Sequence, residues 1–442
     1  MYNTPDYPEV RPLRVLFPLF ILIGAFIVVS CNSTSKQPND SIPVINIEPA
    51  IGNARIVDLS EIAEDIEYIP LETVPNSLLK DLSNIRFEDD KFFIGLFDNK
   101  VFSRSGRYLW TFDKSGRGPG EYTFSQGISK ERGTGNFIVN TLSNKNISLY
   151  IYDSTGIFIQ EKTFPFPYSD KLGTPILLEN DYLLASAPQA SKTRVDFWAL
   201  VMDNKYNVIS KMAPPYDIGD KGIATGHLVI SSTGDANREV PVSVINSYPS
   251  IYTGANLIRL YSPVVDTIYT IDSDYRFIPV LRINHGKIPS SRDKPDNTRG
   301  YGYGKYISLL PKEYKEWNKY LLMAWLMNDY ATEPKIETLN IRGSGSTRKN
   351  TTTYGLYNKE TGDFTFMKKP IEDVYGFRDN IAGGPPFIPT YISHDGKYAV
   401  SLIPTSKIEQ YLNSNPADSR FAEIAKKVAF DDNPVVVLVT LR

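Results

Sequence analysis

The residue types that most often do chemistry are scarce in this chain. Histidine occurs three times, at His227, His285 and His394, and cysteine occurs once, at Cys31. A zinc site of three histidines would need all three to converge, whereas they are far apart in sequence, and His394 precedes an Asp-Gly pair typical of a hairpin turn. No Ser-His-Asp grouping and no Gly-x-Ser-x-Gly motif stands out. The sequence therefore predicts no metal, no cofactor and no assignable catalytic residues.

Candidate ligand-binding residues occur in two polar segments. Residues 117–122 read Arg-Gly-Pro-Gly-Glu-Tyr, so Arg117 offers a forked donor, Glu121 a carboxylate and Tyr122 a stacking face. Arg378 and Asp379 precede a Gly-Gly-Pro-Pro turn and could contribute similarly. Arginine, carboxylates and aromatic rings suit a sugar or peptide ligand. The alternative is that both segments are rigid connectors.

Aspartate and asparagine also recur at turn positions, which raises the question of calcium. Asp153 is followed by Ser-Thr-Gly rather than by the spaced acidic ligands of a calcium loop. Capping of hairpin turns by the Asp side chain is the simpler interpretation.

The N-terminus predicts export and lipidation. Arg11 and Arg14 precede a largely apolar run over residues 15–29, and Val-Val-Ser then leads to Cys31. A basic region, about 15 apolar residues and a small residue fit a secretory signal, and the run is short for a membrane span. The interpretation is a lipoprotein signal peptide, residues 1–30, with Cys31 acylated. An uncleaved signal anchor is the alternative. Residues 31–55 are predicted to be a polar tether.

Composition indicates an all-β protein without affinity for nucleic acid. The chain holds 28 Tyr and 22 Phe, which favour strands, and its 29 Gly and 31 Pro suit many tight turns. A net charge of −2 provides no electrostatic basis for binding nucleic acid.

One hairpin recurs along the chain. Each copy has apolar arms around a turn that starts with Ser, Asp or Asn and usually contains Gly, which accepts a positive φ. The turns start at Ser103, Asp153, Asp203, Asp272 and Asn358. The first spacings are 50 residues, the length of a four-stranded propeller blade.

The repeats predict a six-bladed β-propeller with four-stranded blades, plus short helical insertions. Blades are expected over about 84–112, 127–163, 174–213 and 225–284, then a fifth to about 369 and a sixth from 387 to 441. The sixth lacks one strand, which the segment 66–71 can supply and so close the ring. Residues 56–442 are therefore predicted to be one domain. Hairpins in separate sandwiches are the alternative.

Two stretches show helical spacing. Over residues 311–330, Tyr314, Trp317, Leu321 and Ala324 recur every three or four residues, and Pro311 suits a first helical position. This predicts a helical insertion at about 288–335; a helix on a membrane surface is a weaker alternative. Residues 421–428 repeat the spacing.

Four stretches together resemble the six-bladed β-propeller lipoproteins of Bacteroides-type bacteria, an NHL-like group of unknown function. They are Ile-Glu-Tyr-Ile-Pro-Leu-Glu-Thr at 66–73, Gly-Arg-Gly-Pro-Gly-Glu-Tyr at 116–122, Asp-Thr-Ile-Tyr at 266–269, and Gly-Gly-Pro-Pro-Phe at 383–387 with Asp-Asp-Asn-Pro at 431–434. The resemblance implies the fold across essentially the whole mature chain. It brings no catalytic residues. Ser103, where the family usually has Asp, is a departure.

These observations favour a membrane-anchored envelope propeller that binds a glycan, a peptide or a partner protein. The tether lacks the acidic cluster that, by resemblance, marks surface-exported lipoproteins, so the outer membrane facing the periplasm is favoured over the cell surface. A propeller hydrolase or lyase with an axial active site is the alternative, and a purely structural envelope protein is a third possibility. A histidine lining the axial mouth beside carboxylates would favour the enzyme.

Overall fold

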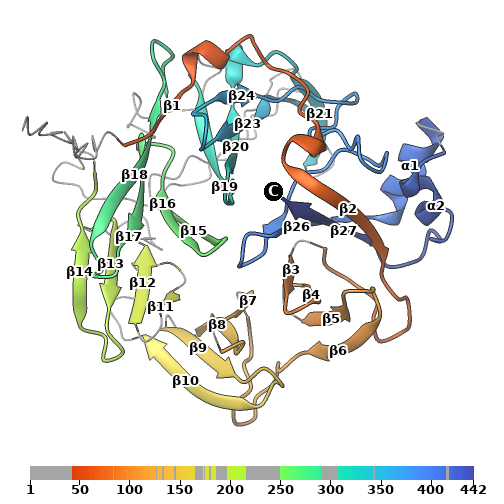
Figure 1. Cartoon of the computed structure of the whole chain (residues 1–442). Helices are drawn as coiled ribbons and strands as arrows, with labels where there is room; N and C mark the ends of the chain where they lie inside the picture. Colours follow the sequence, from red (N-terminus) through yellow and green to blue (C-terminus); the bar gives the residue numbers. More distant parts are fainter. Residues whose placement is uncertain are drawn as a thin grey trace, which may run out of the picture. The chain divides into compact units, whose positions relative to one another are not determined.

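The computed structural model describes residues 42–442 except for 83, 97, 126, 132–133, 144–145, 165–172, 174, 179–180, 186–196, 216–248, 291–305, 342–343 and 415–417. These residues form a six-bladed β-propeller (Figure 1). The signal peptide, Cys31 and His227 lie outside the described residues, so lipidation remains a prediction.

Each blade contains four antiparallel strands, the first nearest the centre of the ring and the fourth on its outer side (Figure 1). Blade 1 contains β3 (Ile85–Glu88), β4 (Lys91–Ile94), β5 (Asn99–Ser103) and β6 (Tyr108–Phe112). Blade 2 contains β7 (Gly127–Lys130), β8 (Phe137–Ser143), β9 (Asn146–Tyr152) and β10 (Phe158–Phe164). Blade 3 contains β11 (Ile176–Leu178), β12 (Asp181–Ala185), β13 (Ala199–Met202) and β14 (Val208–Met212).

The second half of the ring follows the same plan. Blade 4 contains β15 (Ser250–Gly254), β16 (Leu257–Tyr261), β17 (Thr267–Ile271) and β18 (Phe277–Asn284). Blade 5 contains β19 (Ser308–Glu316), β20 (Tyr320–Leu326), β23 (Thr352–Asn358) and β24 (Phe364–Phe366). Blade 6 contains β25 (Tyr391–Ile392), β26 (Tyr398–Ile403), β27 (Val435–Leu441) and β2 (Ala63–Pro70).

The recurring hairpins are the outer turns of the blades, and their geometry follows from the predicted turn chemistry. In blade 2 the Asp153 carboxylate accepts hydrogen bonds from the backbone N–H groups of Thr155 and Ile157, each at 2.9 Å. Gly156 has φ +90°. Where glycine is absent, tyrosine adopts the same conformation, with φ +67° at Tyr206 and +59° at Tyr275.

The two ends of the chain close the ring in blade 6, as the sequence predicts. Strand β2 pairs antiparallel with β27 over its length, with Ile66 opposite Val439 and Pro70 opposite Val435. Because β2 comes before blade 1 and β27 is the last strand, no blade is left with an open seam between the first and last repeats.

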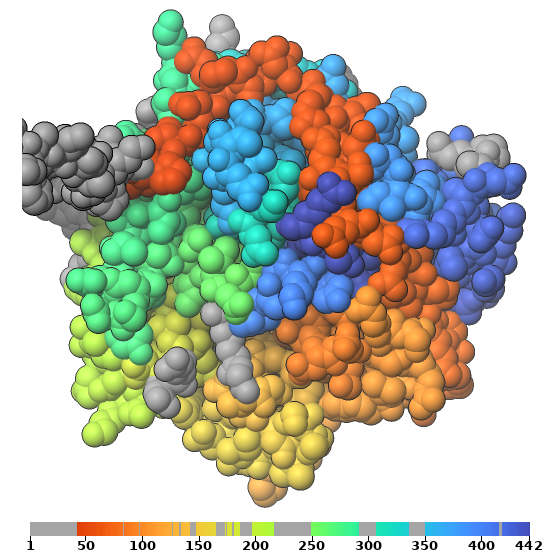
Figure 2. Space-filling view, viewed as in Figure 1, coloured from red at the N-terminus to blue at the C-terminus, as the bar shows by residue number. Residues whose placement is uncertain are grey.

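An additional strand, β1 (Val44–Asn46), lies within the segment predicted to be tether. It pairs parallel with β18, with Val44 opposite Arg282 and Asn46 opposite Asn284, and makes blade 4 five-stranded. The predicted tether boundary at residue 55 is therefore too late. The chain then passes through 3₁₀ turns η1 (Glu48–Ala50) and η2 (Leu59–Glu61) and crosses the end of blade 5 to reach blade 6 (Figure 2).

The helix predicted over residues 311–330 is wrong. That stretch forms β19 and β20, which pair antiparallel, with a register shift between Leu310 and Lys315. Pro311 lies at this irregularity, where a missing backbone N–H is tolerated. The apolar residues at helical spacing are buried because they lie in an inner hairpin covered on both faces.

The true insertion in blade 5 is a hairpin, β21 (Lys335–Ile341) and β22 (Ser344–Asn350), preceded by the 3₁₀ turn η5 (Asn328–Tyr330). Two helices lie between β26 and β27: α1 (Thr405–Ser414) and α2 (Arg420–Ala425). The second corresponds to the predicted spacing from Phe421, and the first was missed. Among the described helices, none has the length and apolarity needed to cross a membrane.

Candidate functional site

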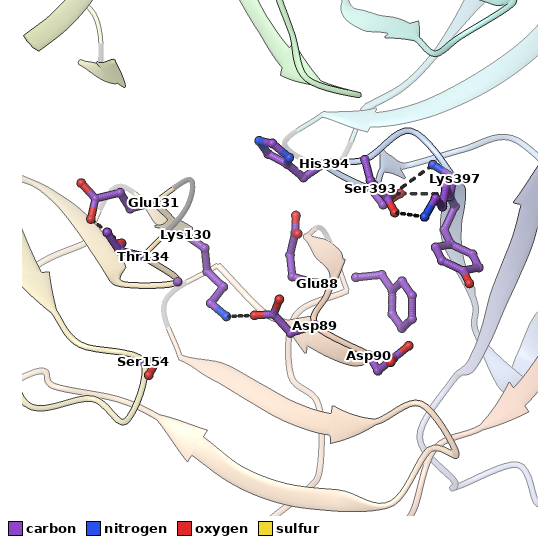
Figure 3. Close-up of a pocket in the computed structure, with 14 residues that line it drawn as sticks. Glu88, Asp89, Asp90, Lys130, Glu131, Thr134, Ser154, Ser393, His394 and Lys397 are labelled. Atoms are coloured by element: carbon purple, nitrogen blue, oxygen red, sulfur yellow. Dashed lines mark hydrogen bonds and ion pairs between the residues drawn. The ribbon is translucent and has the colours of Figure 1, made fainter. Parts of the chain in front are cut away.

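A cavity of about 720 Å³ lies where blades 6, 1 and 2 meet near the centre of the ring (Figure 3). It is lined mainly by the turns between the first and second strands of these blades. Blade 1 contributes residues 87–90, blade 2 contributes 130, 131, 134, 135 and 154, and blade 6 contributes 393–395, 397 and 398. The volume is typical of sites for small ligands.

The turn of blade 1 presents two adjacent carboxylates. Asp89 and Asp90 both have positive φ, +49° and +54°, as a tight two-residue hairpin requires. Oδ2 of Asp89 lies 3.0 Å from Nζ of Lys130 in blade 2. That ammonium group also lies 4.7 Å from the centre of the Phe93 ring and is largely buried. Asp90 is mostly exposed, and its nearest cation, Arg104, is 3.5 Å away.

Glu88, the last residue of β3, is the most enclosed acid of the cavity. Its Oε1 accepts a hydrogen bond from the Tyr391 hydroxyl on β25. Burial raises the pKa of Glu88 despite that bond and the nearby charges of Arg86 and Lys130. Arg86, two residues earlier in the strand, is buried and donates to Oδ1 of Asn99 at 2.6 Å. Burial lowers the pKa of Arg86.

The turn of blade 6 places His394 at the cavity. Beside it, Oδ1 of Asp395 accepts a 2.6 Å hydrogen bond from the Ser393 hydroxyl and one from the backbone N–H of Lys397. Burial alone would raise the pKa of Asp395, but these bonds hold it below its usual value. His394 was predicted to be only a turn residue, and the structure shows that it also lines the cavity (Figure 3).

The electrostatic character of the cavity is acidic. Its lining includes the carboxylates of Glu88, Asp89, Asp90, Glu131 and Asp395, against the ammonium groups of Lys130 and Lys397. Glu131 is held by Thr134 and Asn136, which donate to the same oxygen, Oε2, at 2.6 and 2.8 Å. Such a lining can accept hydrogen bonds from hydroxyl groups and can pair with an amine.

The predicted segment 117–122 lies in the connector from β6 to β7. Because strands alternate in direction, this connector is at the opposite end of the blade from the turns that line the cavity. Tyr122 is 3% exposed and packs in the core, and its burial raises its pKa to about 12. Oε2 of Glu121 accepts from the backbone N–H of Gly118 at 2.7 Å. Tyr122 thus offers no stacking face, and of this segment Arg117 and Glu121 remain exposed.

Arg378 and Asp379 also lie in a connector between blades, from β24 to β25. The exposed Arg378 forms a two-bonded ion pair with Asp58, with Nη2 to Oδ2 at 2.8 Å. Asp379 is 6% exposed, and its carboxylate accepts from the Tyr68 hydroxyl at 2.8 Å. Three backbone N–H groups, those of Ile381, Ala382 and Gly384, complete its shell at 2.7–3.0 Å. Both side chains thus have partners within the chain, and neither lines the cavity.

Of the two histidines that the structure describes, His285 does not line the cavity. His285 follows β18 at the edge of blade 4, with Nδ1 3.7 Å from Oδ1 of Asp266. In the part of the chain that the structure describes, no group of three His, Cys, Asp or Glu side chains is arranged to hold a metal ion.

The acids of the cavity escaped sequence reasoning, although a signal was present. Glu88, Asp89 and Asp90 form an unbroken acidic run between two apolar strands. An Asp pair is less suited than Asn-Gly to a turn with two positive φ angles. Residues that depart from that preference in a positive-φ turn are candidates for function.

Comparison with known proteins shows the family. A model described as a domain of unknown function, DUF4934, matches residues 42–440. The chain is a DUF4934 protein. The match begins two residues before β1, so the DUF4934 region includes the strand that was predicted to be tether. A search of curated proteins returned no match for the chain.

A search of solved structures found proteins similar to this DUF4934 protein, of which the first described below shares its fold. An exported protein of Bacteroides fragilis is 18% identical, with a TM-score of 0.58, and the match covers 90% of this chain and 99% of that one. A DUF4221 member from Bacteroides vulgatus is 12% identical, with a TM-score of 0.46 and coverage of 86% and 97%. A virginiamycin B lyase of Staphylococcus aureus is 10% identical, with a TM-score of 0.38 and coverage of 85% and 99%.

Proposed function

We propose that this protein is a lipid-anchored envelope module that binds a ligand in the cavity between blades 6, 1 and 2. The ligand is an amine-bearing or hydroxyl-rich group, presented by a glycan, a peptide or a partner protein. The observation that carries the proposal is the convergence of five carboxylates from three blades around one cavity of ligand size. The anchor is the acylated Cys31, in the outer membrane facing the periplasm.

The rigidity of the site supports binding. Asp89 is fixed by Lys130, Glu88 by Tyr391, and Asp395 by Ser393. Side chains held before the ligand arrives lose little conformational entropy on binding. The similarity to an exported Bacteroides protein supports a location outside the cytoplasm.

The test is binding to glycan and peptide arrays and capture of partners from membranes, with cavity variants. Asp89→Asn and Asp90→Asn together should weaken binding by about tenfold or more, because each removes a charge-assisted contact. Arg117→Ala, at an exposed connector residue on the opposite end of its blade, is the control and should bind normally. Unchanged binding by the cavity variant would refute this site.

A second candidate function is acid–base catalysis, and the position of His394 favours it. A histidine lies at the same cavity as Glu88, whose pKa burial raises, and such pairs serve as proton donor and acceptor in hydrolases and lyases. The test is turnover of any ligand found on the arrays. His394→Ala and Glu88→Gln should each abolish product formation without abolishing binding; no product from the unmodified protein would exclude catalysis on that ligand.

A further inference from the structure

Exposed apolar side chains recur at one position of the outer strands. In each of blades 1 to 4, the residue three places after the positive-φ residue of the outer turn is a leucine or isoleucine. These residues are Leu109, Ile159, Ile209 and Ile278, and they are 36%, 49%, 47% and 39% exposed. Single exposed apolar residues are ordinary on protein surfaces. Their repetition at an equivalent position in four blades calls for a common explanation.

Blades 2 to 4 carry further exposed apolar residues near the same position. The exposed members are Ile157, Phe158, Ile159, Val208, Ile209 and Ile278, here called the apolar rim. Ile157 is 67% exposed, and Val208 is 44% exposed. Ile157 directly precedes β10, and the other residues lie in β10, β14 and β18, the outer strands of three consecutive blades (Figure 1).

In blades 2 and 3 a backbone irregularity coincides with the exposed residue, whereas in blade 4 the register shift falls at Val280 and Ile278 pairs regularly with Thr270. In blade 2 the pairing steps from Phe158 to Gln160, so Ile159 is an extra residue, and in blade 3 it steps from Val208 to Ser210, so Ile209 is extra. A bulge of this kind breaks the alternation of strand faces and redirects a side chain. In blade 5 the outer strand pairs without a shift, and the equivalent residue is Thr365.

The chain that leads to Cys31 enters the fold beside this rim. Strand β1 runs parallel to β18 with Val44 opposite Arg282, and the carbonyl of Pro43 accepts from the N–H of Arg282, so the first described residues lie alongside the strand that carries Ile278. Thirteen residue steps separate Cys31 from Val44. Even fully extended, they span at most about 45 Å, and a flexible chain of that length spans on average about 20 Å.

We propose that the apolar rim rests in the interfacial layer of the membrane that holds the acyl chains on Cys31. This inference depends on the proposed lipid anchor. The short connection keeps blade 4 near the bilayer, and shallow insertion of apolar side chains fixes which edge faces it. The propeller would then stand tilted, with the outer edge of blades 2 to 4 on the lipid.

The test uses the full lipidated protein in liposomes that contain brominated lipids. Cys31 is the sole cysteine of the chain and its thiol is consumed by acylation, so Ile159→Cys and Ile209→Cys can each be labelled with a polarity-sensitive dye. Glu409→Cys, on the exposed side of α1 beside blade 6, is the matched control.

The expected result is a shift of emission to shorter wavelength and quenching by about twofold or more at positions 159 and 209, with neither at 409. Flotation of the same samples reports the anchor separately. Protein that floats but shows no quenching at 159 and 209 would refute contact of the apolar rim with the membrane, and it would still support the lipid anchor. A wavelength shift without lipid quenching would mean that protein covers the rim, and failure to float would remove the anchor and the inference together.

Discussion

At the scale of single residues, two carboxylates of this propeller differ in how many hydrogen-bond donors surround them. Asp379 is enclosed by four hydrogen-bond donors that satisfy its charge. Glu88 is bound by one hydroxyl, and burial raises its pKa. The first arrangement stabilises a fold, whereas the second leaves a carboxylate that gains by taking a proton or meeting a ligand.

Replacing the enclosed carboxylate should be costly. Asp379→Ala leaves the Tyr68 hydroxyl and three backbone N–H groups without their acceptor, and we expect it to lower the free energy of unfolding by about 3 kcal/mol or more. The neighbouring Arg378→Ala removes an exposed ion pair and should cost under about 1 kcal/mol. Denaturant titration of the two variants measures both values. Equal losses would show that Asp379 is not the structural centre of this connector.

Stability should also depend on pH through Glu88. The folded protein holds the Glu88 proton more tightly than the unfolded chain does, because burial raises its pKa. Its contribution to stability is therefore complete below the ordinary pKa of a glutamate and is lost as pH rises through the raised value. Glu88→Gln should lack this dependence. The measurement is the difference in unfolding free energy between the two proteins across pH, and a difference that stays constant would contradict the burial effect.

At the scale of elements, we expect β1 to contribute to the stability of the folded domain. Ile45 is fully buried, whereas its neighbour Val44 is 38% exposed. Ile45→Ala should cost about 2–4 kcal/mol through lost packing, and Val44→Ala should stay within about 0.5 kcal/mol. Thermal and denaturant unfolding of the pair would check this. Near-equal stability would indicate that β1 contributes little to the core.

The elements that sequence predicts well are those set by local chemistry. The hairpin turns follow from an Asp or Asn side chain capping backbone N–H groups two to four residues on. The β19–β20 hairpin was misread because Pro311 and the spacing of Trp317 and Leu321 suit a helix locally. Burial on both faces of an inner strand removes the alternation that would have marked it. Strand β1 was missed because three residues carry too little pattern.

At the scale of the whole molecule, closure of the ring by β2 and β27 predicts how strongly a disulfide between these strands should stabilise the protein. Asp65 lies opposite Thr440 in this pair, and Lys91 lies opposite Ser103 within blade 1. By the chain-entropy relation, a disulfide at the first pair should add about 6 kcal/mol and one at the second about 3 kcal/mol, because the closed loops differ in length. Comparing oxidised with reduced forms of each double-cysteine variant measures both. A smaller gain from the ring-closing pair would argue against that closure.

The candidate site also depends on the arrangement of the whole ring. Glu88, Lys130 and His394 are brought together only because blades 6, 1 and 2 meet in a ring. No spacing within the sequence encodes that meeting. The predicted connector residues were plausible ligand groups by type, but partners elsewhere in the chain engage most of them: Asp58 pairs with Arg378, and the core encloses Tyr122.

The parallel pairing of β1 with β18 has a mechanical consequence. The carbonyl of Pro43 accepts from the N–H of Arg282, and the N–H of Ile47 donates to the carbonyl of Asn284, each at 2.9 Å. A pull on the chain at residue 42, directed along the strand, loads these bonds together in shear rather than breaking them one after another. The propeller should therefore withstand tension applied through its N-terminal end without losing a blade.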